Sequence, residues 1–469
     1  MTSKAPAAKD ERMGAFDAVM YDVEGDPLLR SGIVAFVVLD GPPDRAQVAA
    51  RVERLTRVFP RLRQRAVGNQ FSPAPPRWET DPNFDPSYHV RWRRLLDDEA
   101  DMQAALDYAA RVSESDFDHA RPLWEIAILT GLVDGQAAVI FKIHHSVADG
   151  MGGLAMSAAL FDLSAQPDDL GPMPDAPADA APADLLERVI HATRFEFGAV
   201  EEVVVGSTRL ALRAMRAVAT RPVSTALSAG RTAVSAAAML APQGPPRSEW
   251  MTGRSLTSHF TIVQVPLAAL KAAAHRADVT LNVVFMAAVA DAVGAYHRRH
   301  GHDLESIRVN MPIDQRRPGD APTGNHWVPA RFLVPTDDST PTDRLYRLQG
   351  LLHLARTDPA LGLSEMVYKA LALLPAPLTE RLAGGLMKGV DVAATNVPGS
   401  PVPVYMCGAQ VTTLVPFAPK SGAAINVALL TYGGSAFIGV NADPAAVDDP
   451  AELTACLAEA FADLTAEEA

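Results

Sequence analysis

The stretch from residue 421 to residue 442 contains no charged side chain and is long enough to cross a lipid bilayer. Within it, the runs INVALLTY and SAFIGVNA are rich in β-branched and aromatic residues. Gly433 and Gly434 separate the two runs, and such a pair is typical of the two-residue turn in a β-hairpin. The stretch therefore predicts a hairpin, and no transmembrane helix is expected.

The N-terminal part alternates strand and helix patterns. An apolar run at residues 33–39 predicts a strand, and a helix is expected to begin near Asp44. A further strand pair is expected at residues 126–130 and 137–144, because Asp134-Gly135 between them favours a tight antiparallel reversal. A helix at residues 151–161 is expected to follow the second of these strands.

Residues 167–184 contain five prolines and five aspartates, and this composition buries too little apolar surface to fold alone. A long helical region follows at about residues 185–240, and mixed strand and helix patterns resume in the C-terminal half. This order favours a layered α/β protein. We divide the chain into an N-terminal domain at 1–166, a linker with connecting helices at 167–250, and a C-terminal domain at 251–469.

Composition narrows the classes of function. The chain has 469 residues, and its 42 lysines and arginines against 55 aspartates and glutamates give a net charge of −13. A nucleic-acid partner is therefore not expected. Two cysteines cannot form a disulfide framework, and the first residues lack the apolar segment of a signal peptide, so a cytoplasmic location is expected.

The main chemical motif is His144-His145-Ser146-Val147-Ala148-Asp149-Gly150, placed where a strand ends and a helix begins. Adjacent histidines on a strand point to opposite faces, so they are poorly arranged to bind one metal ion, and no metal is expected. One imidazole can face a substrate, because a neutral imidazole is a competent general base near neutral pH. The alternative is that both histidines are core residues beside an Asp-Gly turn.

HHxxxDG is the signature of the CoA-dependent acyltransferase superfamily, and the chain as a whole resembles the bacterial wax ester synthase/diacylglycerol acyltransferases. The resemblance covers nearly the whole chain from about residue 13. It rests on segments spread along the sequence, namely Phe16-Asp17-Ala18, Pro60 to Arg65, Phe84-Asp85, His89-Val90, Arg121 to Glu125, Gly324-Asn325, Asn396 to Gly399 and the late hairpin.

The resemblance implies two chloramphenicol-acetyltransferase-like layered domains with mixed sheets and an active-site tunnel between them. It implies that His145 is the catalytic base and that His144 is structural. Asp149 is expected to pair with an arginine and, with Gly150, to hold the turn. No cofactor is expected, since acyl-CoA serves as a co-substrate.

Further residues fit the substrate channel of the family. Pro122, Leu123 and Trp124 either line that channel or belong to the core. The segment from Asn396 to Gly399 either approaches the thioester or is a simple Pro-Gly reversal. Asn282 is a channel candidate too, but Val283 follows it where the family usually has an aspartate.

The resemblance implies an acyl-CoA-dependent O-acyltransferase that makes triacylglycerol or wax ester from diacylglycerol or a long-chain alcohol. Two alternatives stay open. One is acylation of another hydroxyl or amine acceptor, as in condensation-type or polyketide-associated relatives. The other is a catalytically weakened lipid- or acyl-CoA-binding homologue, for which the absent carboxylate at Val283 is the only argument.

The insoluble acceptors of the family imply peripheral contact with a membrane or lipid inclusion. A helix over residues 203–219 would place Arg209, Arg213 and Arg216 on one stripe opposite an apolar side. Such a helix either lies on an anionic lipid surface or packs its apolar side on the protein, leaving the arginines solvated.

Overall fold

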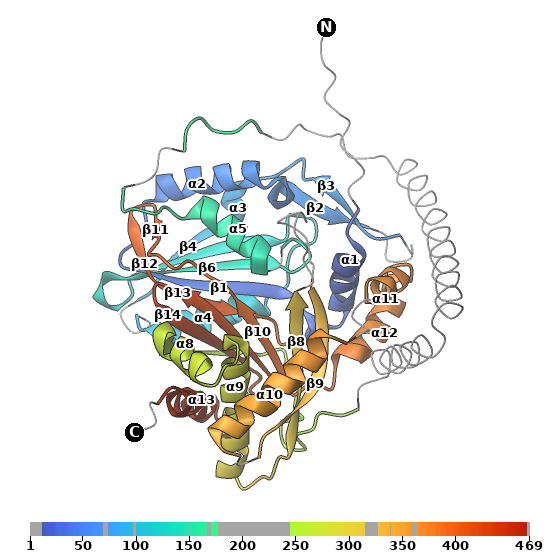
Figure 1. Ribbon diagram of the computed structural model, residues 1–469. Coiled ribbons are helices and arrows are strands. Elements are labelled where there is room, and N and C mark those ends of the chain that lie inside the picture. Colours follow the sequence, from blue (N-terminus) through green and yellow to red (C-terminus); the bar gives the residue numbers. More distant parts are fainter. Residues whose placement is uncertain are drawn as a thin grey trace, which may run out of the picture.

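The computed structural model describes residues 12–68, 74–96, 100–148, 150–166, 170–176, 244–314, 327–337, 339–358 and 364–466. Two six-stranded sheets, each covered by helices, form the two halves of the molecule (Figure 1). Both sheets contain parallel and antiparallel pairs. This confirms the predicted α/β class with two layered domains and mixed sheets, whereas the tunnel between them stays a prediction.

The first sheet contains, in spatial order, β11 (Tyr405–Met406), β12 (Ala409–Phe417), β1 (Gly32–Leu39), β6 (Ala137–His144), β5 (Trp124–Thr130) and β4 (Val90–Arg94). The helices of this half are α1 (Ala15–Asp22), α2 (Arg45–Val58), α3 (Pro86–His89), α4 (Met102–Glu114) and α5 (Gly150–Leu160). A separate two-stranded sheet pairs β2 (Gln64–Val67) with β3 (Arg77–Thr80). Short 3₁₀ turns include η1 (Val23–Gly25), η2 (Pro27–Leu29), η3 (Pro60–Arg63) and η5 (Val133–Gly135).

The second sheet contains, in spatial order, β7 (His259–Pro266), β14 (Ser435–Ala442), β13 (Ile425–Tyr432), β10 (Val392–Val397), β8 (Ser306–Asp314) and β9 (Trp327–Pro335). Its helices are α8 (Leu267–Arg276), α9 (Leu281–Arg299), α10 (Pro341–Arg356) and α13 (Pro450–Thr465), whereas α11 (Ser364–Leu371) and α12 (Ala376–Met387) pack against α1 and η1 of the first half. The long helix α9 contacts α8, α10 and α13, and together with one face of the sheet these helices enclose the core of this half.

The expected elements of the N-terminal part are present. Asp44 caps α2, since its carboxylate accepts hydrogen bonds from the N–H groups of Ala46 and Gln47. β5 and β6 form the expected antiparallel pair. Asp134 and Gly135 have positive φ values of 60° and 73°, but they lie within the longer connection 131–136 rather than forming a tight two-residue reversal.

The uncharged stretch at 421–442 is the predicted hairpin, β13 and β14. Gly433 and Gly434 form its turn with φ values of 54° and 89°. One face of the hairpin belongs to the core around α9, and Tyr432 and Phe437 on the other face join the core of the first half. Burial on both faces explains why the stretch lacks charge.

Among the described residues, no single helix is long and apolar enough to span a membrane; α8 and α9 meet the length and composition test only together, and they are bent by 99°. The expected helical region at 185–240, with Arg209, Arg213 and Arg216, lies outside the described residues. The same holds for most of the Pro/Asp stretch, of which residues 170–176 are described.

The C-terminal part of the chain contributes β11 and β12 to the first sheet. β12 pairs antiparallel with β1, with Val34 opposite Phe417. The domain division at residue 251 stays a prediction, and the structure adds that residues 405–417 lie in the sheet of the first half.

The two sheets meet where β12 passes over β13 and β14. The ring of Phe417 stacks on Phe260 of β7, with ring centroids 4.0 Å apart and an interplanar angle of 3°. A Cβ atom on Gly439 of β14 would lie 2.1 Å from the carbonyl oxygen of Pro416. A glycine at this position therefore allows the backbones of the two sheets to approach closely.

We expect Gly439→Ala to lower the midpoint of thermal unfolding, with a cost of about 1–3 kcal/mol from overpacking. Gly350→Ala is the matched control, because Gly350 lies within α10 and a Cβ there meets nothing within 4 Å. The control should leave stability unchanged or raise it by about 0.5–1 kcal/mol. Equal unfolding midpoints for Gly439→Ala and the wild type would show that the two sheets do not meet as described.

Candidate active site

The two histidines lie at the end of β6, where the strand is fixed by backbone hydrogen bonds. His144 is paired with Gly32 of β1. The N–H of His145 donates a hydrogen bond to the carbonyl oxygen of Ser31 at 2.9 Å. The N–H of Val147 donates a hydrogen bond to the carbonyl oxygen of His144, also at 2.9 Å. The main chain therefore turns directly after the strand and places the two imidazoles in different surroundings.

The imidazole of His144 is fully buried, with a polar neighbour near each ring nitrogen. Its Nδ1 accepts a hydrogen bond from the N–H of Ser146 at 3.0 Å, and the Oγ atom of Ser146 lies 2.6 Å from the same nitrogen. A backbone N–H can only donate, so the proton of the neutral imidazole resides on Nε2. Nε2 lies 3.0 Å from the Oε2 atom of Glu24.

Glu24, in η1, is the charged neighbour of this histidine. Burial raises the pKa of the Glu24 carboxyl, but His144 and a hydrogen bond from the Ser31 N–H outweigh burial and hold that pKa below its ordinary value of 4.5. The rings of Tyr21 and Phe117 lie edge-on to His144, with centroids 5.9 and 6.0 Å away. Burial and nearby acidic groups raise the pKa of Tyr21 to about 12, so it is a neutral hydroxyl.

The side chain of His145 is only partly buried. Of the two adjacent imidazoles, it is the one that keeps access to solvent. A partly exposed imidazole beside a rigidly held neighbour is suited to exchanging a proton with a bound substrate. The roles of His145 as base and of His144 as support stay predictions, and these surroundings agree with them.

The remaining motif residues are only partly described. Asp149 lies outside the described residues, so its predicted arginine partner stays a prediction. Gly150 is the first residue of α5.

Pro122, Leu123 and Trp124 are buried at the start of β5. The indole N–H of Trp124 donates to the carbonyl oxygen of Leu62 at 2.7 Å, and its ring stacks on His89 with centroids 4.4 Å apart. These contacts agree with the core alternative for this segment rather than with a channel lining.

The structure brings Asn282 and Asn396 together from separate elements. The Asn396 side-chain amide, at the end of β10, donates to the Asn282 side-chain oxygen at the start of α9. Gly399 follows β10, and a Cβ atom there would lie 2.1 Å from the carbonyl oxygen of Thr431. A glycine at position 399 therefore allows the chain to pass close to β13. The proximity of this segment to the substrate stays a prediction.

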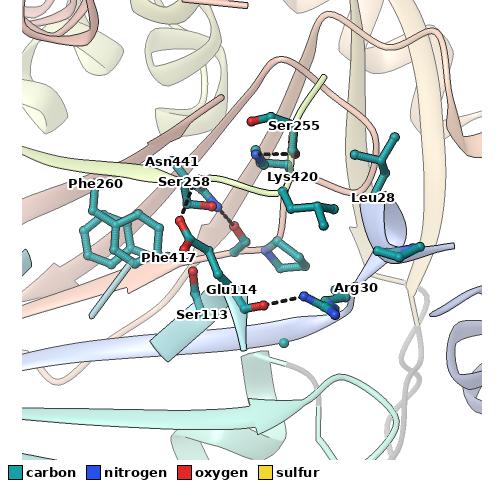
Figure 2. Close-up of a pocket in the computed structure, with 15 residues that line it drawn as sticks. Leu28, Arg30, Ser113, Glu114, Ser255, Ser258, Phe260, Phe417, Lys420 and Asn441 are labelled. Carbon is teal, nitrogen blue, oxygen red and sulfur yellow. Dashed lines mark hydrogen bonds between the residues drawn. The ribbon is translucent and has the colours of Figure 1, made fainter. Parts of the chain in front are cut away.

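A small hollow that is open to solvent lies between the two halves (Figure 2). Gly32, Glu114 and Phe417 line it from the first half, and Phe260 of β7 lines it from the second half. Glu114, Phe260 and Phe417 are labelled in Figure 2. The Glu114 carboxylate accepts a hydrogen bond from the Ser258 N–H at 2.6 Å, which joins the halves. Because Gly32 is the partner of His144 in the sheet, the hollow lies close to the backbone that carries the motif.

A family model for the wax ester synthase/diacylglycerol acyltransferase catalytic domain matches residues 13–285, and the model for the C-terminal domain of that family matches residues 323–465. A protein of Mycobacterium tuberculosis H37Rv assigned as a diacylglycerol O-acyltransferase is 31% identical over 467 residues, covering 99% of this chain and 94% of the relative. The chain belongs to the wax ester synthase/diacylglycerol acyltransferase family. It is therefore an acyltransferase, as its motifs predicted.

Other members and solved structures agree with this family membership. A second M. tuberculosis H37Rv diacylglycerol O-acyltransferase, tgs1, is 28% identical over 451 residues, covering 92% of this chain and 91% of the relative. The wax ester synthase/diacylglycerol acyltransferase of Marinobacter aquaeolei VT8 has a TM-score of 0.64 at 17% identity, covering 97% and 98% of the two chains. The starter condensation domain of rhizomide synthetase, solved with C8-CoA, has a TM-score of 0.56 at 15% identity, covering 97% and 94%. Both structures share the fold.

Val283, where the family usually has an aspartate, lies in the core of the second half. Its side chain is 2% exposed, among the buried residues around α9. A carboxylate placed there in this chain would lose its hydration without a described ion-pair partner. The valine therefore fits its surroundings here, and the neighbouring Asn282 carries the polar contact.

Sequence reasoning missed Glu24, the buried partner of His144. No local motif marks it, because it lies far from the histidines in sequence and only the packing of η1 against the end of β6 brings the two together. Glu24, Asp116 and His119 also place potential ligand atoms within 4.8 Å of one another. The contacts of Glu24 with His144 and Ser31 account for its carboxylate without a metal ion.

We expect Glu24→Gln to lower the free energy of unfolding at about pH 7 by roughly 1–3 kcal/mol, and with it the unfolding midpoint, because the substitution removes a buried charge-assisted contact. Since the pKa of Glu24 is depressed in the fold, its contribution is present above its ordinary pKa of 4.5 and is lost as pH falls through the folded value. The difference in unfolding midpoint between the wild type and Glu24→Gln should therefore become smaller below about pH 4.5.

Thermal unfolding followed by circular dichroism across this pH range checks the prediction. Glu459→Gln is the control, because its carboxylate is 56% exposed and pairs with Arg299 at the surface, where ion pairs contribute little. A Glu24→Gln variant as stable as this control at neutral pH would contradict the proposed support of His144.

Proposed function

We propose that this chain transfers a long-chain acyl group from acyl-CoA to the hydroxyl of diacylglycerol or a long-chain alcohol, with His145 as the general base. The observation that carries the proposal is the contrast at the end of β6, where His144 is locked by Ser146 and Glu24 and His145 remains partly exposed. Membership in the family and the names of the mycobacterial relatives support the choice of acceptor. The C8-CoA bound to the condensation domain is consistent with a CoA thioester as donor.

The reaction needs a base because an alcohol has a pKa far above neutral and attacks a thioester poorly. In the proposed step, an imidazole nitrogen of His145 takes the hydroxyl proton while the oxygen attacks the thioester carbonyl. The C–S bond then breaks, and the CoA thiolate leaves with the proton that His145 returns. The products are an ester and free CoA, and the imidazole is neutral again.

Direct transfer fits the described residues better than an acyl-enzyme. Burial raises the pKa of the Cys407 thiol to about 11, and burial also raises the pKa of Cys456, so neither cysteine is a thiolate near neutral pH. The Ser146 side chain is 5% exposed and directed at His144. A buried hydroxyl in this position is poorly placed to attack a long-chain thioester.

We expect His145→Ala to reduce acyl transfer by about 10²–10⁴-fold, the range typical of a lost general base, without a change in unfolding midpoint. The measurement is CoA release and ester formation from a long-chain acyl-CoA, with diacylglycerol and a long-chain alcohol as acceptors. His275→Ala is the control, because His275 is an exposed histidine in the last turn of α8.

The control variant should transfer at the wild-type rate. A folded His145→Ala variant with wild-type activity would exclude His145 as the base. A wild-type protein that releases CoA with neither acceptor, but does so with another hydroxyl or an amine, would overturn the acceptor class.

A further inference from the structure

Arg331 on β9 and Asn310 on β8 lie directly opposite one another in the second sheet. The alternating neighbours Val309, Met311 and Val334 belong to the core around α9. Since successive side chains of a strand point to opposite faces, Arg331 and Asn310 lie on the face turned away from α9.

The guanidinium of Arg331 lacks a polar partner within the described part of the chain. Its Nε atom is buried without a hydrogen bond, and so is the Oδ1 atom of Asn310 beside it. Arg308, two residues before Asn310 on β8, is already engaged by the carbonyl oxygens of Gly244, Pro245 and Gly389. Among the residues that the structure describes, no carboxylate forms an ion pair with this cation.

Three other cations with little exposure among the described residues are paired with carboxylates. Arg51 contacts Asp162, Arg344 lies 3.0 Å from Asp291, and Lys420 lies 2.9 Å from Asp443. A charge withdrawn from water is costly unless it is paired, so an unpaired one suggests a partner that arrives from outside the chain.

Tyr368 of α11 is a second donor at this place. It is near enough to Arg331 for each to influence the pKa of the other; burial raises the pKa of Tyr368 to about 12, so its hydroxyl keeps its proton. The ring of Tyr368 packs edge-on to Phe16 of α1, with centroids 4.7 Å apart. Phe16 belongs to the first half and Arg331 to the second, so these donors lie at the seam between the halves.

We propose that Arg331 and the Tyr368 hydroxyl bind a phosphate group of a substrate between the two halves. A guanidinium offers only donors and the protonated phenol adds one more, and phosphate oxygens, like those of a carboxylate, are acceptors that a guanidinium binds in bidentate fashion. This inference rests on the proposed function, because that function names acyl-CoA as the donor substrate. Under the proposed function the phosphate is that of the CoA moiety of the donor, and a phosphorylated glycerol lipid, which is not among the proposed acceptors, is tested as the other source of phosphate.

The experiment measures dissociation constants by calorimetry for the wild type, Arg331→Gln and Arg381→Gln. CoA and 4′-phosphopantetheine are each compared with pantetheine, and lysophosphatidate with monoacylglycerol, because 4′-phosphopantetheine and lysophosphatidate differ from their partners only in a phosphate. Arg381→Gln is the matched control, since Arg381 is an exposed arginine on α12. Tyr368→Phe removes the second donor while keeping the ring on Phe16.

We expect Arg331→Gln to bind CoA or lysophosphatidate at least fivefold more weakly than the wild type, in line with the loss of a charge-assisted hydrogen bond. Its affinity for the phosphate-free partner should be unchanged, Arg381→Gln should bind as the wild type does, and Tyr368→Phe should show a smaller loss. The ligand-free Arg331→Gln protein should be at least as stable as the control variant, since an unpaired cation is removed.

Two results would overturn the proposal. One is a loss of less than fivefold for every phosphate-bearing ligand. The other is a ligand-free Arg331→Gln variant that unfolds at a clearly lower temperature than Arg381→Gln, which would make Arg331 a structural cation. Because the readout is binding, inactivity of the wild type in the transfer assay would count against the proposed function and leave this result interpretable.

Discussion

Strand β1 is the element on which the rest of the structure depends. One edge pairs with β6, which carries the two histidines, and the other edge pairs with β12, which comes from the C-terminal part of the chain. Gly32 lies opposite His144 and Val34 opposite Phe417, so both partners are fixed within three residues of β1. The histidine motif therefore lies beside the seam of the two halves, because β1 pairs with the strands on both of its edges.

The position at the end of β6 explains why the two adjacent imidazoles, those of His144 and His145, have different surroundings. The backbone bonds of His144 and His145 to Leu123 and Ser31 set the turn. Packing of η1 and α1 then encloses His144 with Glu24 and Tyr21, while His145 stays partly exposed. A rigid neighbour with a defined tautomer holds the proposed base in position without itself meeting the substrate.

Local patterns in the sequence predicted the elements whose signals are local. Gly433-Gly434 and Asp134-Gly135 marked two hairpins, and Asp44 marked the start of α2. Pairing of β12 with β1 joins segments nearly the whole chain apart, and nothing within either segment specifies that register. The contact between Glu24 and His144 was missed for the same reason, because the tertiary packing of distant elements creates it. The family resemblance identified the histidine motif but not the side chains that surround it. At Val283, the packing of the core around α9 explains a residue that the family pattern did not explain.

The central claim is that the thioester is attacked directly by an acceptor hydroxyl that His145 activates. A rapid-quench experiment with excess long-chain acyl-CoA, combined with intact-protein mass spectrometry, tests it most directly. The account predicts no stoichiometric burst of CoA and no acylated protein before acceptor is added, followed by equal amounts of CoA and ester when diacylglycerol or a long-chain alcohol is present. A burst of CoA equal to the enzyme concentration, with an acyl group covalently attached to the protein, would contradict direct transfer.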